Sequence, residues 1–228
     1  MPKMSDSFES FLICPVRNAT PEQIEAIERH IAALEADGEK LYWPYKHTVQ
    51  TGDPVGVRIC TDNRRAMFHA DIVRLWFDAG SKGSCFDMGM AAFLIDALDR
   101  PFLSVVNPEE LENAPHSPQR TIALALAGHL TDNFYGGWKL APRYSAHEEY
   151  FSKLETMLFW EGRACVAFHA FSKDDPWDLF RLGLAFAGMV ETPHRIIAPN
   201  DLPPTEDKSF NNFLLALAER TKDGPRMV

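Results

Sequence analysis

The sequence lacks the features that mark membrane-spanning and nucleic-acid-binding proteins. No stretch of the 228 residues reaches the roughly 20 consecutive apolar residues that a membrane-spanning helix needs. Basic residues are outnumbered, with 23 Lys and Arg against 32 Asp and Glu, and such an acidic chain is poorly suited to phosphate backbones. We therefore expect a small-molecule partner, and neither a membrane nor a nucleic-acid partner.

Metal and redox motifs are missing as well. The four cysteines lie far apart without a CxxC pair, and the eight histidines form no HxxxH pair. The sequence therefore predicts buried free thiols, no metal and no cofactor. Residues 1–10 contain two acidic side chains and no apolar run, so we expect neither a signal peptide nor a transit peptide. We predict a cytoplasmic protein.

What is present is typical of a folded α/β protein. Hydrophobic residues make up 46% and charged residues 24% of the chain, which are ordinary globular values. Apolar runs bounded by turn-forming residues predict strands at 11–14, 41–43, 71–77 and 102–106. Helices are predicted between them at 21–37, 53–69 and 86–98, with a loop at 45–52. This alternation predicts a parallel sheet with helices on both faces.

The first helix has the best-marked ends. Thr20 is a good N-cap, Pro21 occupies the first helical position, and Gln23 is placed for a capping box, while Gly38 ends the helix. In parallel sheets, ligands bind beyond the carboxyl ends of the strands. We therefore expect the functional residues in the loops at 15–20 and 78–87.

The second half of the chain is less regular. We divide the chain into a first domain at 1–131 and a smaller C-terminal α/β extension at 132–228. In the second half, helices are predicted at 121–130, 146–160, 177–189 and 210–220, and strands at 165–171 and 195–198. Its many aromatic side chains are expected to pack against the first half or a second subunit.

A shift of 94 residues suggests a degenerate repeat. Phe86 and Gly89 then meet Phe180 and Gly183, among four identities in 23 positions. That number does not establish a duplication, because a shared strand-turn-helix pattern explains it almost as well. Arg181 stands where Asp87 stands in the first copy, so a duplicated site would have lost that carboxylate.

The segment 80–91, preceded by an Ala-Asp pair at 70–71, resembles the nucleoside 2-deoxyribosyltransferase family and the related deoxynucleoside-monophosphate N-glycosidases. The resemblance covers about 11–107 and implies a flavodoxin-like (Rossmannoid) fold. In that family a Glu attacks the anomeric carbon of the deoxyribose and holds it as a glycosyl-enzyme intermediate. Asp87 occupies the position of that Glu. The family's sites are often completed across a homodimer interface, so a homo-oligomer is expected.

The sequence departs from the family pattern at both catalytic carboxylates. Asp87 is one methylene shorter than the expected Glu, and Asn63 stands where the family has an Asp that orients the sugar and assists proton transfer, with Asp62 beside it. An amide still hydrogen-bonds a sugar hydroxyl but is neither an acid nor a base. Either the site is re-spaced around Asp87 and Asp62, or it binds its ligand without turnover.

The chemistry of an N-glycoside also favours Asp87. Breaking the C–N bond passes through an oxocarbenium-like state that a nearby carboxylate stabilises or traps. At a helix start beyond a strand, backbone N–H groups and the helix dipole are expected to keep Asp87 ionised. The alternative is an ordinary Asp at a helix start.

The remaining candidates would bind substrate. Ser81, Gly83 and Ser84 form a turn that could cradle an anion, and the resemblance implies that Ser81 contacts a 5′-phosphate. Lys82 and Arg17 add positive charge, and Asn18 lies on the same rim. The alternative for the segment from Ser81 to Ser84 is an ordinary turn built from turn-forming residues. Aromatic side chains could stack on a base, namely Tyr42, Trp43, Tyr45 and His47, although core packing is favoured for Trp43.

These observations predict an enzyme that cleaves or exchanges the base of a (deoxy)nucleoside 5′-monophosphate, with hydrolysis and transfer left open. Two alternatives stand beside it. One is a nucleotide-binding sensor or regulatory module that has kept the pocket and lost the chemistry. The other is a glycosidase that consumes NAD.

Overall fold

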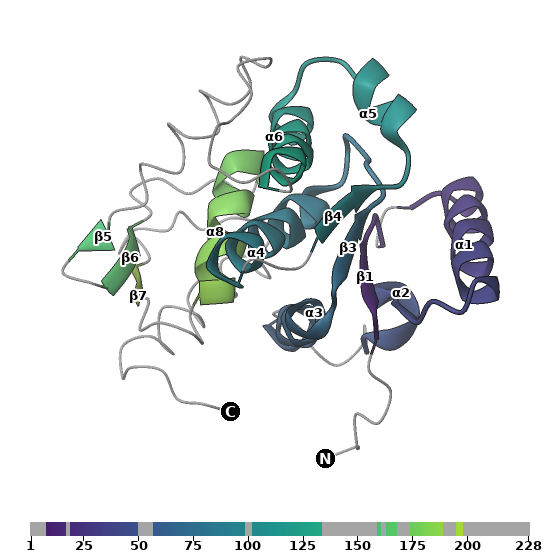
Figure 1. Cartoon of the computed structure of the whole chain (residues 1–228). Helices are drawn as coiled ribbons and strands as arrows, with labels where there is room; N and C mark the ends of the chain where they lie inside the picture. The colour runs from purple at the N-terminus through teal and green to yellow at the C-terminus, as the bar shows by residue number, and fades with distance from the viewer. Residues whose placement is uncertain are drawn as a thin grey trace.

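The protein is built on a four-stranded parallel sheet (Figure 1). The computed structural model describes residues 8–16, 19–49, 57–98, 102–133, 159–160, 163–167, 174–188 and 195–197. The sheet has the order β2-β1-β3-β4, and its strands are β1 (Ser10–Ile13), β2 (Leu41–Tyr42), β3 (Ile72–Leu75) and β4 (Phe102–Val105). All pairings are parallel. The predicted α/β class and its flavodoxin-like arrangement are confirmed.

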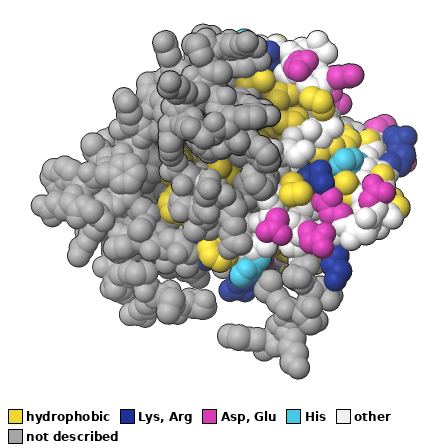
Figure 2. Space-filling model, viewed as in Figure 1, with side chains coloured by type: hydrophobic (Ala, Val, Ile, Leu, Met, Phe, Trp, Pro, Cys, Tyr) yellow, Lys and Arg dark blue, Asp and Glu magenta, His cyan; other side chains and the backbone are white. Residues whose placement is uncertain are grey.

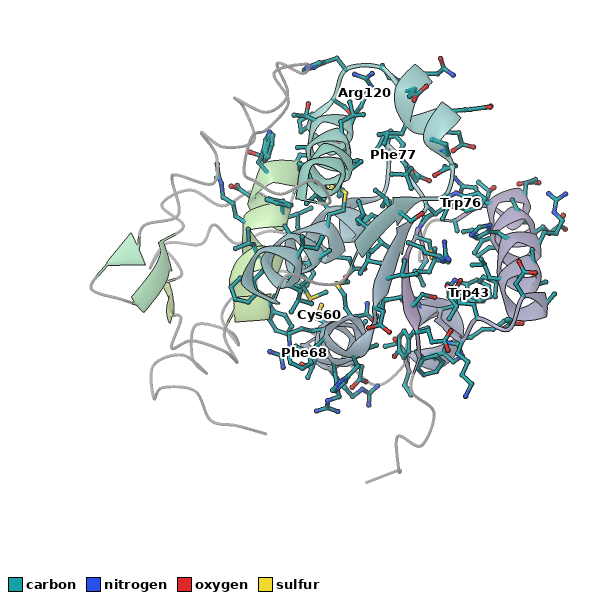
Figure 3. All side chains as sticks on the ribbon, viewed as in Figure 1. Trp43, Cys60, Phe68, Trp76, Phe77 and Arg120 are labelled. Atoms are coloured by element: carbon teal, nitrogen blue, oxygen red, sulfur yellow. The ribbon has the colours of Figure 1, made fainter. Side chains whose placement is uncertain are left out.

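Alternate residues of β1 face two separate parts of the core. Phe11 and Ile13 pack in a cluster with residues of α3 (Val57–His69), α4 (Lys82–Leu98) and α6 (Pro118–Asn133). Leu12 and Cys14 pack on the opposite face with α1 (Pro21–Ala36). All four residues of β1 are buried, as expected for a central strand with helices on both sides. Trp43 and Trp76 fill the α1 side (Figure 3).

The predicted start of α1 is confirmed in detail. The Thr20 hydroxyl accepts a hydrogen bond from the Gln23 N–H at 3.2 Å, and Gln23 Oε1 accepts one from the Thr20 N–H at 2.9 Å. This reciprocal pair satisfies two N–H groups that a helix start would otherwise leave free. Gly38 follows the helix with a φ of +91°, a conformation that side chains disfavour.

Two segments that were predicted as loop or turn are helical. Residues 44–47 form α2 (Pro44–His47), because Pro44 starts the turn and His47 Nδ1 accepts a hydrogen bond from the Trp43 N–H at 2.8 Å. The second correction is at α4, which begins at Lys82 rather than near residue 86. A short helix, α5 (Pro108–Asn113), was not predicted.

The C-terminal part contains a smaller α/β unit. β6 (Arg163–Ala167) pairs in parallel with β7 (Arg195–Ile197) and antiparallel with β5 (Phe159–Trp160), and α8 (Pro176–Gly188) packs on α4. The predicted strands at 165–171 and 195–198 and the helix at 177–189 correspond to β6, β7 and α8. The helix predicted at 146–160 is wrong at its end, where the two residues of β5 pair with β6.

Other predictions for this part are not decided. Residues 146–158 and 210–220 lie outside the described residues. The division into domains at 131 stays a prediction, although α6 continues past that position to Asn133. No helix in the described ranges combines the length and the hydropathy that crossing a membrane requires.

The described part of the surface carries charges of both signs close together. Figure 2 shows Lys and Arg side chains intermingled with Asp and Glu on the visible face. Ion pairs account for part of this pattern, such as Lys46 with Glu28 at 3.8 Å on the exposed side of α1 and α2. The visible described surface therefore carries no large patch of one sign.

Candidate functional site

The site lies where the strand order of the sheet reverses. β1 is flanked by β2 on one side and β3 on the other, and the loops that follow β1 and β3 therefore diverge to opposite faces. A crevice at the carboxyl ends of such strands is the usual ligand site of this sheet type. Burial is the main cause of the raised pKa of the Cys14 thiol, the first residue after β1, and Asp87 is close enough to add to it.

Asp87 lies in the second turn of α4, and its carboxyl group is enclosed. Part of the residue remains accessible to solvent, yet burial of the carboxyl raises its pKa from 3.8 to about 7. The prediction that helix N–H groups and the helix dipole keep Asp87 ionised is therefore wrong. Because α4 starts at Lys82, Asp87 is too far along the helix to reach its free N–H groups.

Asn63 is brought to Asp87 from a different helix. The Asn63 side chain, 6% exposed, projects from α3 and donates a hydrogen bond to the Asp87 carboxyl, which partly offsets the effect of burial on the Asp87 pKa. These two residues are the positions at which the sequence departs from the family pattern. The fold thus brings together the carboxyl and the amide that the sequence analysis selected.

No family model, curated protein or solved structure matches this chain.

A buried chain of hydrogen bonds fixes the orientation of the Asn63 amide. The Thr48 hydroxyl donates to Asn63 Oδ1 at 2.8 Å, and the Tyr42 hydroxyl is 2.9 Å from the Thr48 oxygen. Since Thr48 has a single hydroxyl proton and gives it to Asn63, Tyr42 is the donor in the other bond. With Oδ1 occupied by Thr48, the NH₂ group of Asn63 is the end that faces Asp87.

The serine turn is used to start α4. The Ser84 hydroxyl donates to the Ser81 hydroxyl oxygen at 2.8 Å, and the Ser84 N–H approaches the same oxygen at 3.4 Å. Ser81 therefore caps the helix, while Gly83 has open space on its side-chain position. Lys82 forms an ion pair with Asp174, which reduces the positive charge that we predicted for this turn.

The loops that follow β1 and β3 are tied together. Gln23, at the start of α1, donates through Nε2 to Asp78 Oδ2 at 2.7 Å, and Asp78 Oδ1 also accepts the Gly80 N–H at 2.6 Å. Asp78 lies between β3 and α4. Arg17 and Asn18, predicted on the rim of this site, lie outside the described residues.

The other two described candidates contact different parts of the core, Asp62 beside Tyr42 and Tyr45 against Trp43. Asp62 is half-buried and lies near enough to Tyr42 to contribute to the raised pKa of that phenol, of which burial is the larger cause. Tyr45 is 46% exposed and stacks on Trp43, with 5.0 Å between ring centroids. Trp43 itself is 1% exposed, so its predicted place in the core is confirmed.

Sequence reasoning missed the supporting residues of the site. Thr48 lies in a segment interpreted as a loop and belongs to no motif, so nothing in the sequence singled it out. Tyr42 was considered for base stacking, but its hydroxyl serves the hydrogen-bond chain. Burial raises the pKa of the Cys14 and Cys85 thiols to about 12, in keeping with the predicted buried free thiols. Within the described ranges, His, Cys, Asp and Glu form no group of three that could hold a metal.

Proposed function

We propose that this protein is a nucleoside 2-deoxyribosyltransferase-like enzyme that cleaves or exchanges the N-glycosidic bond of a (deoxy)nucleoside 5′-monophosphate. The observation that carries the proposal is the contact between the Asp87 carboxyl and the Asn63 amide, made by two helices beside the carboxyl end of β1. A buried carboxyl with a strongly raised pKa and a specific polar partner is typical of a reactive group.

In this mechanism Asp87 is the nucleophile. Its carboxylate oxygen attacks the anomeric carbon, the C–N bond breaks, and the base departs with the bonding electrons and takes up a proton. Water or a second base then attacks the anomeric carbon and releases Asp87. Asn63 is the residue that orients the carboxyl and is free to hydrogen-bond a sugar hydroxyl; Thr48 and Tyr42 hold that amide in place.

The substrate's phosphate is assigned to the first turn of α4. The Ser81 hydroxyl and the N–H groups of Lys82 and Gly83 are the donors proposed for an anion, while the buried Ser84 hydroxyl donates to Ser81 and orients it. Gly83 leaves the approach open. In this proposal Asp62 and Tyr45 line the side of the base and sugar, and Arg17 and Asn18 border the phosphate.

The direct test is release of free base. The purified protein is incubated with each deoxynucleoside and ribonucleoside 5′-monophosphate, with and without an acceptor base, and the bases are followed by chromatography. Asp87→Ala should lower the rate by at least about a thousandfold, because the nucleophile is removed. The matched control is Glu110→Ala, on exposed α5, which should retain the wild-type rate. Equal rates for Asp87→Ala and wild type would refute the mechanism.

The pH dependence provides a second test. Attack requires the ionised carboxylate, so kcat/KM should rise with pH through about 7 and then level off. The Asn63 hydrogen bond lowers the Asp87 pKa, and Asn63→Ala should therefore move the midpoint to higher pH. A midpoint that does not move in this variant would remove Asn63 from the mechanism.

One observation favours the alternative of a nucleotide-binding module without catalysis. With a pKa of about 7, Asp87 is largely protonated in mildly acidic solution, and a neutral carboxyl is a hydrogen-bonding group rather than a nucleophile. In that case a nucleotide raises the melting temperature while no base is released. Asp87→Asn would then leave the affinity nearly unchanged.

A further inference from the structure

The contact between α4 and α8 is the most extensive helix pairing among the described elements (Figure 1). A glycine on each helix makes its closest approach to the other helix. A methyl group at Gly89 would overlap the Phe180 carbonyl, and one at Gly183 would overlap the Phe86 carbonyl. Residues 86 and 89 of α4 correspond to 180 and 183 of α8 after a shift of 94. Gly89 therefore contacts Phe180, and its counterpart Gly183 contacts Phe86, which is the counterpart of Phe180.

Such reciprocity is the signature of an isologous interface, in which one patch contacts its own copy. If position i of one unit contacts position j of the other, position j of the first must contact position i of the second. Gly89 with Phe180 and Gly183 with Phe86 satisfy this condition. Any antiparallel helix pair makes reciprocal contacts of this kind; what the shift of 94 adds is that both close-approach positions are glycine and both of their partners are phenylalanine.

The strands on either side of these helices repeat with the same spacing. In the first sheet Ile72 pairs with Phe102, 30 residues later. In the second sheet Val166 pairs with Ile196, also 30 residues later and in parallel. Val166 and Ile196 are the positions reached from Ile72 and Phe102 by the shift of 94. The register of the two strand pairs is thus the same.

The helix starts also correspond. α4 begins at Lys82 and α8 at Pro176, 94 residues later. Ser81 caps α4, and its counterpart Asp175 accepts the Trp177 N–H at 2.9 Å before α8. Strand register, helix start, cap and interface therefore agree on one shift, whereas sequence identity alone did not decide it.

We infer that β6-α8-β7 is a second copy of β3-α4-β4, and that the two copies form a dimer-like interface within one chain. The α4 face on which a second copy would pack is already occupied by α8. Since α4 carries Asp87, this internal partner also supports the helix of the candidate site.

The second copy has residues of different charge at the positions that correspond to the candidate site. Ser81, Ser84 and Asp87 correspond to Asp175, Asp178 and Arg181, and Arg181 Nη1 is 3.0 Å from Asp178 Oδ1. Carboxylates replace both hydroxyls of the turn that is assigned to a phosphate, and a guanidinium replaces the nucleophile. One site per chain follows, a conclusion that rests on the proposed function.

A chemical cross-link tests the internal pairing on the unaltered protein. Lys82 and Asp174 form an ion pair between the starts of α4 and α8, and both are more than half exposed. A carbodiimide should activate the Asp174 carboxyl and join it to Lys82 Nζ as an amide, with the reagent released as a urea. In a mixture of ¹⁴N- and ¹⁵N-labelled chains, the linked peptides should carry a single isotope. Mixed peptides, or no such link, would overturn the inference; Lys82→Arg is the control that keeps the charge but forms no amide.

A double-mutant cycle tests the reciprocal contact. Gly89→Ala and Gly183→Ala should each lower Tm by more than about 5 °C, since each forces the same two helices apart. Combined, they should lower Tm by clearly less than the sum, because the sites are coupled. Gly83→Ala, with open space around it, should change Tm little. Additive effects, or a wild-type Tm for either Gly89→Ala or Gly183→Ala, would contradict the shared interface. If a variant cannot be purified, the cross-link decides.

Ligand stoichiometry tests the loss of the second site. Titration with dAMP, dGMP, dCMP and dTMP should give one site per chain for any that bind. Two equivalent sites would refute the loss. If none of the four binds and none is cleaved, the proposed function fails for these substrates, whereas the cross-link and the glycine cycle still decide the internal pairing.

Discussion

Glu39, just before β2, and Asp87, in α4, are carboxyl groups in opposite electrostatic situations. Glu39 receives two hydrogen bonds from the Arg74 guanidinium, at 2.8 and 2.5 Å, and this pairing lowers its pKa. Asp87 has the Asn63 amide as its specific polar partner, and burial raises its pKa to about 7. The comparison separates a carboxylate that is paired with a guanidinium within the fold from a buried carboxyl whose specific polar partner is a neutral amide.

The largest effect on stability should come from breaking the Glu39 pair. Arg74→Met leaves a partly buried carboxylate without its guanidinium and should lower the free energy of unfolding by about 2–3 kcal/mol at pH 7. A lowered pKa stabilises the fold above the unfolded value of 4.5, and the benefit is lost as the pH falls through the folded pKa. Urea unfolding at pH 7 and pH 4 should therefore show a smaller deficit at pH 4.

A surface pair provides the control for this variant. Lys46→Met removes an exposed ion pair with Glu28 at 3.8 Å and should cost less than about 0.5 kcal/mol. Similar losses for Arg74→Met and Lys46→Met would show that the Glu39 pair contributes no more than a surface contact.

The next effect has the opposite sign. The folded pKa of Asp87 lies above the unfolded value of 3.8, so the native state holds an extra proton between the two values and loses stability as the pH rises through them. Asp87→Asn removes this penalty and should increase the free energy of unfolding by about 1–3 kcal/mol at pH 8. At pH 4 the difference from wild type should nearly vanish.

Denaturant unfolding at both pH values measures this change. Asp62→Asn removes the same formal charge from the neighbouring helix and controls for net charge. A variant Asp87→Asn that is less stable than wild type at pH 8 would mean that the carboxylate is already satisfied by the protein.

A smaller loss of stability, though above that of the surface control, should come from breaking the hydrogen-bond chain behind Asn63. Thr48→Val keeps the shape but removes the donor to Asn63 Oδ1, at a cost of about 1 kcal/mol. With the amide no longer fixed, the midpoint of the pH–activity profile should rise, and Thr48→Ser should restore it. A stability loss without a shift of the midpoint would restrict Thr48 to a structural role.

The start of α1 and the start of α4 show how far the sequence predicts this protein. The α1 boundary depends on Thr20, Pro21 and Gln23, which are neighbours in the chain, so the pattern contained the whole interaction. At α4, the turn-forming residues around Gly83 concealed a first helical turn that Ser81 caps. Local patterns predict an element well when its ends are specified locally.

The site follows the same distinction. Asp87 and Asn63 were selected from the sequence because they stand at positions of the resembled motif. The raised pKa of Asp87 was not predicted, since it depends on burial of the carboxyl, which arises only when the chain folds. Thr48 was missed because its partners, Tyr42 and Asn63, lie 6 and 15 residues away and share no motif with it.

The bond between Gln23 and Asp78 has a mechanical consequence for access to the site. It spans 55 residues of sequence and joins the loops that leave β1 and β3 toward opposite faces of the sheet. While the bond holds, the first turn of α1 and the segment between β3 and α4 stay together, so a movement that separates them must break one amide–carboxylate contact. The oxygen of the same Gln23 amide caps α1, and a movement that draws Asp78 away would therefore pull on the first turn of that helix.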